Sequence, residues 1–108
     1  IKNHVSYITP FDITSTDEVT AKFVKNYKEA YGADPDQFAA DGYDAIYALV
    51  EAMKAANITD ANIKASDLCE AVKAAIPADS FKLVGATGSM TWDASGAPTK
   101  VPVIVEIQ

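Results

Sequence analysis

The spacing of apolar residues changes at Pro77, and no other feature of the sequence constrains the fold as strongly. Before Pro77, apolar side chains recur every three or four residues, which is the spacing of one face of an α-helix. After Pro77, they alternate with polar side chains in short runs, which is typical of β-strands. The chain therefore contains both kinds of element, and we expect an α/β fold.

Three helices are predicted in the first part of the chain. The first covers about residues 16–31 and ends at Gly32, which suits a left-handed C-terminal cap. The second begins at Pro35 and covers about residues 35–56, and the third covers residues 66–76.

The second predicted helix contains the stretch "DPDQFAADGYDAIYAL", which has a glycine in its second turn. Glycine costs about 1 kcal/mol relative to alanine inside a helix, so Gly42 is expected to let the helix approach a neighbouring backbone. Asp41 and Asp44 lie three residues apart and are expected on a solvated face, although such a pair could in principle act as acid and base. The apolar face of this helix is predicted to comprise Phe38, Gly42, Ala45, Ile46, Leu49 and Met53.

Strands are predicted at both ends of the chain and in a hairpin. The stretch "HVSYITPF", residues 4–11, is rich in β-branched and aromatic residues. Residues 80–93 contain two short strands separated at residues 85–88. A final strand covers residues 100–108, and Pro102 makes its beginning an edge or a crossover because proline has no backbone N–H.

This order of elements is unusual for a complete domain. One strand precedes three helices, and only a hairpin and one more strand follow them. A parallel sheet needs alternating strands and helices, and here the helices have too few strands to cover. We therefore expect the chain to be one piece of a larger α/β protein.

Composition excludes several classes of partner. The 108 residues include 9 basic and 15 acidic side chains, none of the basic ones arginine, and the formal net charge is −6. Nucleic acid binding depends on neutralising phosphates, so we expect no nucleic acid partner. No apolar run approaches the roughly 20 residues of a membrane helix.

The residues needed for catalysis or metal binding are also missing. Cys69 is the single cysteine and His4 the single histidine, which excludes an internal disulfide and a cysteine-based metal cage. Cys69 is expected on the apolar side of the third helix. No nucleophile motif, phosphate loop or zinc motif is present. We therefore predict no enzyme activity, no metal and no cofactor.

Two stretches together resemble the type I periplasmic substrate-binding proteins of ABC transporters, especially the branched-chain amino acid receptors. The first, "FVKNYKEAYGADPDQFAADGYDAIYALVEAMKAA", is similar to a family helix, a Tyr-Gly-x-x-Pro linker and a helix opening with Phe-x-x-x-x-Tyr-Asp-Ala. The second, "FKLVGATGSMTWDASGAPTKVPVIVEIQ", is similar to the family's Gly-x-x-Gly, its Thr-Trp-Asp-x-x-Gly hairpin and its last strand. The resemblance spans nearly all of the chain and covers the C-terminal portion of such a receptor.

The resemblance implies a fold of two lobes that close on a small ligand. Residues 1–12 would form a strand and one hinge crossing, residues 13–98 the C-terminal part of the first lobe, and residues 99–108 the return crossing and final strand. The hinge candidates are Thr9, Pro10 and Pro102, although both prolines also suit ordinary loops.

The resemblance also points to candidate ligand-binding residues. Phe38 matches the position from which the first lobe presents an aromatic side chain toward the ligand, and packing in the core is the equal alternative. Asp41 and Tyr43 are further candidates. Trp92 is expected to cover the helices and not to touch ligand.

By resemblance, the expected function is that of a solute-binding component of an ABC transporter. It would bind a small polar compound, an amino acid such as Leu, Ile or Val or a relative of these, and deliver it to a permease. The expected location is extracytoplasmic, in a periplasm or as a lipoprotein at the cell surface. Two alternatives stay open: a ligand-sensing domain of a regulatory protein with the same fold, and a self-associating piece, such as a homodimer, that binds no ligand without the remainder of the receptor.

Overall fold

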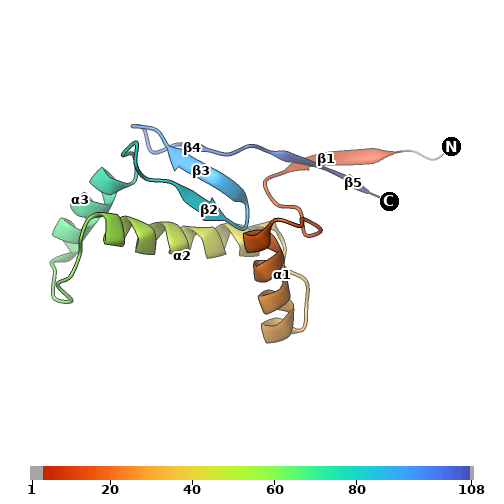
Figure 1. Ribbon diagram of the computed structural model, residues 1–108, viewed down its shortest axis with the longest axis horizontal. Helices are drawn as coiled ribbons and strands as arrows, with labels where there is room; N and C mark the ends of the chain where they lie inside the picture. Colours follow the sequence, from red (N-terminus) through yellow and green to blue (C-terminus); the bar gives the residue numbers. More distant parts are fainter. Residues whose placement is uncertain (1–3, 108) are drawn as a thin grey trace.

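The two end strands form a separate two-stranded ribbon. We analysed a computed structural model in which residues 4–107 are described. β1 (Val5–Thr9) pairs antiparallel with β5 (Val103–Ile107), and the register places Thr9 opposite Val103. The ribbon projects away from the rest of the molecule (Figure 1). The two predicted end strands are thus confirmed, and they are each other's partners.

A second sheet has three antiparallel strands. β2 (Leu83–Gly85) and β3 (Gly88–Trp92) form the predicted hairpin, and β3 also pairs with the two-residue strand β4 (Pro98–Thr99). The turn between β3 and β4 is held by Asp93, whose carboxylate accepts hydrogen bonds from the Ser95 backbone N–H at 2.8 Å and from the Ser95 hydroxyl at 2.6 Å. These hydrogen bonds lower the pKa of Asp93, and the bond from the Ser95 hydroxyl has the largest effect.

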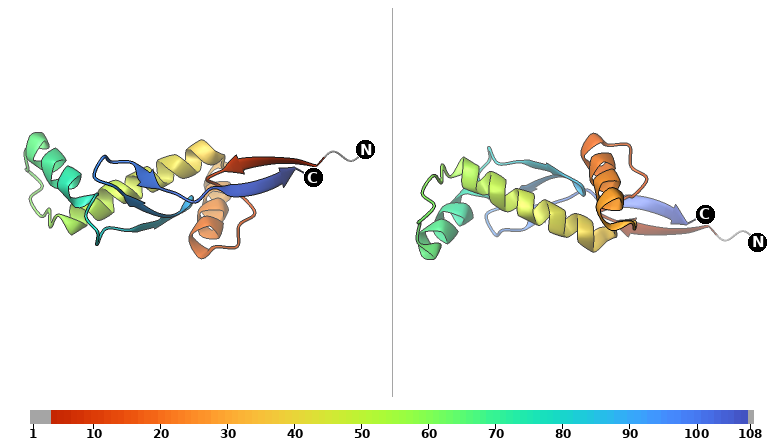
Figure 2. Two further views of the ribbon diagram at one scale, coloured as in Figure 1. Left: turned by 90° about the horizontal axis from the view of Figure 1, so that it is seen from above. Right: turned by 90° about the horizontal axis from the view of Figure 1, so that it is seen from below.

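The three predicted helices are present. They are α1 (Glu18–Tyr31), α2 (Gln37–Ala55) and α3 (Ala65–Ala75). Gly32 ends α1 in the left-handed conformation with φ 66°, as its sequence position predicts. α2 lies along one side of the hairpin. α1 lies across the beginning of α2, and α3 lies at the end of the molecule farthest from the ribbon (Figures 1 and 2).

The buried face of α2 is not the predicted one. The buried side of α2 carries a row of residues spaced four apart: Ala40, Asp44, Ala48 and Ala52. In the hairpin, Ala86 packs with Ala40, and Leu83 packs with Ala48. Of the predicted apolar face, Phe38 is 78% exposed, Ile46 62% and Leu49 47%. Ala45 is also exposed, so its expected place in the core is wrong. Small side chains let the strands approach the helix closely, so α2 turns its small residues toward the hairpin and its larger apolar residues away from it.

The core consists of two small clusters. One joins Phe11, Phe23, Val24, Ala40 and Ala86, and the other joins Ala48, Leu83 and Met90, with Trp92 packed against it. The radius of gyration is 16.6 Å, whereas a compact domain of this length would have about 13 Å. The elongated shape and divided core agree with a chain that lacks part of its packing partners.

The third helix lies against the end of α2 without a buried side of its own. None of its described residues is fully buried, and Leu68 and Val72 are half-buried. Cys69 is exposed, so its predicted place on the inner side of this helix is wrong. Because α3 has no deeply buried side among its described residues, Cys69 lies at the surface although it is small and apolar.

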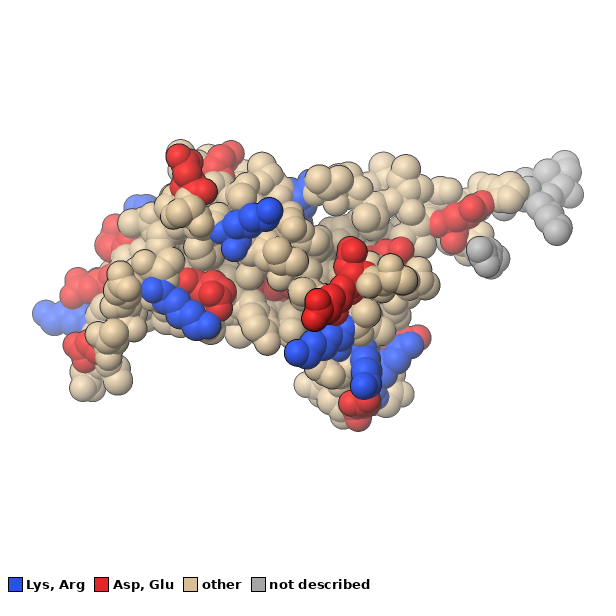
Figure 3. Space-filling model, viewed as in Figure 1, with Lys and Arg blue, Asp and Glu red and all other residues tan. Residues whose placement is uncertain are grey.

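Acidic residues outnumber basic ones by 15 to 9 in the sequence. On the face drawn in Figure 3, acidic and basic side chains are interspersed, with lysines most numerous over α1. Within residues 4–107, no helix has the length and apolar character needed to span a membrane. The same residues contain no group of three or more side chains suited to hold a metal ion.

Candidate functional site

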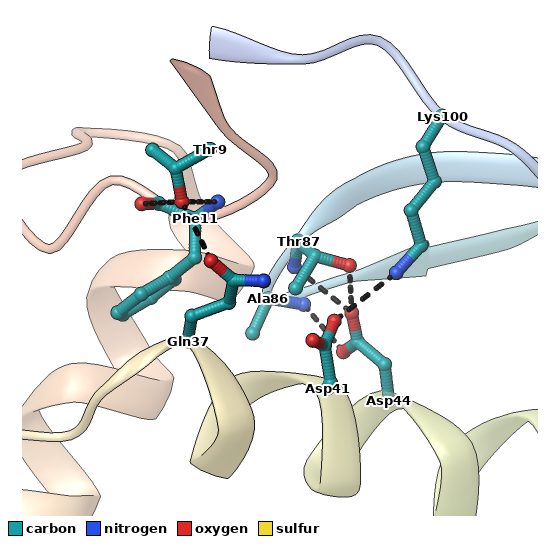
Figure 4. Close-up of polar contacts among 8 residues, drawn as sticks. All are labelled: Thr9, Phe11, Gln37, Asp41, Asp44, Ala86, Thr87 and Lys100. Carbon is teal, nitrogen blue, oxygen red and sulfur yellow. Dashed lines mark hydrogen bonds and ion pairs between the residues drawn. The ribbon is translucent and has the colours of Figure 1, made fainter. Parts of the chain in front are cut away.

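A buried carboxylate on α2 holds the hairpin turn. Asp44 is 3% exposed, and it accepts hydrogen bonds from the backbone N–H groups of Ala86 and Thr87 at 2.6 and 2.9 Å. It also accepts one from the Thr87 hydroxyl at 2.5 Å. Hydrogen bonds to a charged acceptor are stronger than neutral ones, and a buried charge is tolerated only when it is bonded in this way. Asp44 therefore fixes the turn of the β2–β3 hairpin to the middle of α2 (Figure 4).

The same turn requires a glycine beside the carboxylate. A Cβ atom at Gly85 would overlap the side chain of Asp44. On the opposite side of the turn, the Thr20 hydroxyl of α1 donates to the Ala86 carbonyl oxygen at 3.0 Å. Ala86 and Thr87 are both buried, which is unusual for a turn, and their polar groups are satisfied by α1 and α2. The turn thus joins the two helices.

These contacts correct two expectations drawn from the sequence. Asp44 does not lie on a solvated face, because the hairpin covers it. Gly42 does not allow a close approach, because a Cβ there would meet no described atom within 4 Å. The glycine that close packing requires is Gly85. Asp41 and Asp44 also bind separate groups, so they do not form an acid and base pair.

The end of β1 meets the beginning of α2. Thr9, the last residue of β1, is 3% exposed, and its hydroxyl oxygen accepts the Phe11 backbone N–H at 3.2 Å. The same hydroxyl lies 3.2 Å from the Phe11 carbonyl oxygen and 3.3 Å from Gln37 Oε1. A hydroxyl has one proton, so it donates to one of these two acceptors at a time. The root of the ribbon is thereby attached to the first residue of α2.

The segment between β4 and β5 meets α2 one turn later. Lys100 stands between β4 and β5, and its Nζ lies 3.3 Å from Asp41 Oδ1. The side chains are 25% and 38% exposed, so the ion pair is partly screened by solvent. Pro102 follows Lys100 and directly precedes β5, as Pro10 directly follows β1. All three predicted hinge residues, Thr9, Pro10 and Pro102, lie where the ribbon joins the body.

Phe38 lies beside this junction with its side chain in solvent. It is the second residue of α2, next to Gln37, and 78% of it is exposed. An aromatic ring so exposed at the end of the body nearest the ribbon is available to a ligand or to another part of a larger protein. The alternative of core packing does not hold among the described residues.

Tyr43 lies in an aromatic groove between α1 and α2. Its ring centroid is 4.8 Å from that of Phe23 and 4.7 Å from that of Tyr47. The groove has a volume of about 530 Å³, and Tyr27 and Tyr31 also line it. The hydrogen bond to Tyr47, with burial and the nearby charge of Asp44, raises the pKa of Tyr43 to about 12. The hydroxyl of Tyr43 therefore stays protonated at neutral pH.

The structure does not bring the three predicted ligand-binding residues together. Asp41 and Tyr43 are two residues apart, which places them on nearly opposite sides of the helix, since each residue turns the helix by about 100°. Asp41 faces Lys100, between β4 and β5, whereas Tyr43 faces α1. Phe38 lines neither the aromatic groove nor the Asp41 contact, so a single ligand would not touch all three within this chain.

Four polar residues of this region were not singled out from the sequence: Gln37, Thr20, Thr87 and Lys100. Their partners are 28 to 66 residues away in sequence, so local pattern offers little signal for them. One signal was present for Asp44. It stands four residues from Ala40 and four from Ala48, within a row of small residues that a neighbouring strand can approach.

The comparisons with known proteins agree with this arrangement of helices, hairpin and ribbon. The family model described as "Periplasmic binding protein" matches residues 2–107. The chain belongs to this family. The match covers almost the whole chain, so it includes the ribbon, the three helices and the hairpin.

Solved structures of periplasmic binding proteins contain the same fold. A protein assigned as a branched-chain amino acid ABC transporter from Rhodospirillum rubrum is 29% identical with a TM-score of 0.70, over 92% of this chain and 27% of that one. A solute-binding protein from Rhodopseudomonas palustris BisB5, in complex with 3,4-dihydroxybenzoic acid, is 21% identical with a TM-score of 0.78, over 96% and 26%. A substrate-binding protein from Desulfitobacterium hafniense, in complex with Leu, is 23% identical with a TM-score of 0.72, over 97% and 28%.

The chain therefore spans about a quarter of the length of these solved structures. The comparison with curated proteins found no match. The periplasmic binding protein family and the solved structures are solute-binding proteins of ABC transporters and not enzymes, as the sequence predicts for this chain. The predicted family and the predicted fold, a portion of a type I periplasmic binding protein, are confirmed.

Proposed function

We propose that this chain is part of a receptor that binds an amino acid such as Leu, Ile or Val between two lobes and delivers it to an ABC permease. The observation that carries the proposal is the pair of adjacent crossings in a chain that matches the periplasmic binding protein family from residue 2 to 107. Two similar structures support the ligand class, because one is assigned to branched-chain amino acids and one is in complex with Leu.

The proposed division of the chain follows the root of the ribbon. Residues 1–12 and 99–108 are the two crossings, and residues 13–98 belong to the first lobe. Residues 1–3 and 108, at the ends of the crossings, lie outside the described residues. Thr9, Pro10 and Pro102 are the proposed hinge residues. The pairing of Thr9 with Val103 supports this, since it holds the two crossings side by side where they leave the body.

Phe38 is the proposed contact to the ligand's apolar side chain. Its ring is exposed, and its neighbour Gln37 reaches the root of the ribbon, so the second lobe would stand opposite this end of the body. Asp41 and Tyr43 are proposed to contribute less directly, because each is engaged by other residues of the chain. An exposed aromatic wall supplies apolar contact, while polar recognition of the ligand would come from the rest of the receptor.

The proposed location is extracytoplasmic, in a periplasm or at the surface of a cell through a lipid anchor. The proposed partners are the small ligand, the permease and the remainder of the receptor, with no nucleic acid. The excess of 15 acidic over 9 basic residues, and the interspersed charges on the face drawn in Figure 3, support the proposal that nucleic acid is not a partner.

A second candidate concerns the 108-residue chain without the rest of the receptor. The exposed apolar residues on the outer side of α2, among them Phe38, Ile46 and Leu49, support self-association of the isolated chain, for example as a homodimer. The ribbon also has two unpaired edges, which favour pairing with another strand.

Calorimetric titration of the full-length receptor with Leu, Ile and Val tests the main proposal. We expect saturable binding to one site, and a Phe38→Ala variant with about tenfold weaker binding, because a buried aromatic contact contributes on the order of 1–2 kcal/mol. The matched control is Tyr31→Ala, which removes another exposed aromatic ring, on α1 and away from the ribbon. Absence of binding by all three amino acids would contradict the proposed ligand class, and unchanged affinity of Phe38→Ala would remove Phe38 from the site.

A further inference from the structure

One stripe of polar side chains on α2 holds three separate parts of the chain. Gln37, Asp41 and Asp44 follow a spacing of four and three residues, so they share one side of the helix. Gln37 contacts the first crossing, Asp41 the second crossing and Asp44 the hairpin turn (Figure 4). The stripe thus connects both crossings to the same rigid element.

The three contacts differ in how firmly they hold. Asp44 is buried and makes three hydrogen bonds, so it anchors the hairpin to α2. The contact of Gln37 with Thr9 shares one hydroxyl proton with the Phe11 carbonyl oxygen, at nearly equal distances of 3.3 and 3.2 Å. The Asp41–Lys100 pair is a single contact at 3.3 Å between partly exposed groups. The two contacts to the crossings can therefore be exchanged or broken without exposing a buried charge.

A weak contact has a large effect only where it biases an equilibrium between two arrangements. Partly exposed ion pairs contribute little to folding. By contrast, apparent affinity for a ligand scales directly with the fraction of molecules in the competent arrangement. A rotation of the second lobe relative to the first would move the crossings against α2, and it would change the distances from Gln37 to Thr9 and from Asp41 to Lys100.

We propose that Gln37 and Asp41 are positioning residues that set the equilibrium between open and closed arrangements of the two lobes. This inference rests on the proposed two-lobed receptor. Each residue acts through a crossing, Gln37 through Thr9 and Asp41 through Lys100, and neither needs to touch the ligand. Asp44 supplies the fixed point by holding the hairpin to the same helix.

The test measures the distance between spin labels, one on each lobe of the full-length receptor, by pulsed electron spin resonance without ligand. Asp41→Asn and Lys100→Met each remove the ion pair and are expected to shift the populations of the distance distribution in the same direction by about two- to fivefold. The double variant should shift them no further than either single variant, since both remove the same contact. Exchanging the charges, with Asp41→Lys and Lys100→Asp together, should restore the original distribution.

Two further variants complete the test. Glu51→Gln is the matched control, because Glu51 forms an exposed ion pair with Lys54 at 2.8 Å on the same helix, away from the crossings. It should leave the distribution unchanged. Gln37→Met keeps the length of the side chain and removes its hydrogen bonding, and it should shift the distribution. If Asp41→Asn behaves like Glu51→Gln, or if the two single effects add, the proposal is overturned for Asp41, and an unchanged distribution in Gln37→Met overturns it for Gln37.

This readout separates the inference from the proposed function. A residue that only contacts ligand would leave the ligand-free distribution unchanged, so a shift in Asp41→Asn identifies positioning. Addition of Leu, Ile or Val to the unmodified receptor tests the function by itself. If none of them changes the distances, the proposed ligand class fails whether or not the variants shift the ligand-free equilibrium.

Discussion

At the scale of single residues, the buried carboxylate of Asp44 decides how α2 and the hairpin fit together. Its two oxygens accept three hydrogen bonds from the turn, and the chain leaves space for it by placing glycine at position 85. The cost of burying a charge is offset only while all these donors are present. Asp44 and Gly85 are therefore a matched pair.

Removal of this carboxylate should markedly lower the stability of the full-length receptor. Asp44→Ala leaves the buried N–H groups of Ala86 and Thr87 without an acceptor, and we expect a loss of about 2–4 kcal/mol in the free energy of unfolding. Glu51→Ala on the exposed side of the same helix should change it by less than about 0.5 kcal/mol. Urea denaturation of both variants of the full-length receptor provides the comparison, and equal effects would contradict the role of Asp44.

The raised pKa of Tyr43 predicts a dependence on alkaline pH. The pKa rises from 10.0 to about 12 because Tyr47 is hydrogen-bonded to it and burial disfavours the phenolate. The stabilisation from neutral Tyr43 is fully present below pH 10 and is lost as the pH rises through about 12.

NMR titration of ring-labelled tyrosines measures this directly. At pH 10, where an ordinary tyrosine is about half ionised, the Tyr43 resonance should remain at its neutral position. Tyr47→Phe should move its midpoint toward 10, since the hydrogen bond is the largest cause of the shift. An unshifted midpoint near 10 in the unmodified protein would disprove the prediction.

At the scale of elements, sequence pattern predicted the order of helices and strands but not which side of α2 is buried. Helical spacing of Phe38, Ile46 and Leu49 favours the large apolar side chains as the inner face, yet these are exposed. Ala40 and Ala48 pack against the hairpin instead, because packing of a strand against a helix depends on close approach. The only local signal for this packing is the spacing of four residues between Ala40, Asp44 and Ala48.

The candidate site was predictable only in part for the same reason. Sequence placed Thr9, Pro10 and Pro102 near crossings, and these residues lie at the root of the ribbon. It did not reveal the contacts of Gln37 with Thr9 or of Lys100 with Asp41, because each joins residues far apart in sequence. A carboxylate on a helix is usually solvated, so the sequence predicts a surface position for Asp44.

We expect the exposed apolar side of α2 to be covered in the full-length receptor, since helices with apolar residues on most sides are buried. Ile46→Ala should change the stability of the isolated chain by less than about 0.5 kcal/mol, because Ile46 is 62% exposed there. In the full-length receptor the same change should cost about 2–4 kcal/mol. Ala48→Leu, on the hairpin side, should destabilise both proteins by about 1–3 kcal/mol. Equally small effects of Ile46→Ala in both would show that this side stays uncovered.

At the scale of the whole molecule, the chain is elongated and resembles one portion of a larger protein. Its described residues extend over 60 × 32 × 21 Å, its core is divided, and its ribbon projects from the body (Figure 2). The two segments that lead into the ribbon are both attached to the first two turns of α2, through Thr9 and Lys100. This arrangement suits a joint between two lobes better than an independent domain.

The isolated chain should therefore associate with itself. Sedimentation velocity at rising concentrations is expected to show a growing fraction of dimer or larger species, and Ile46→Glu should reduce it by placing a charge on the exposed apolar side of α2. A well-folded chain that remains monomeric at every concentration would rule out this behaviour.

A two-lobed receptor that contains this chain should close on an amino acid. Small-angle X-ray scattering of the full-length receptor, with and without saturating Leu, Ile or Val, tests it most directly. Closure of two lobes about the crossings predicts that at least one of these ligands reduces the radius of gyration. A radius of gyration that stays the same with all three amino acids would contradict the account.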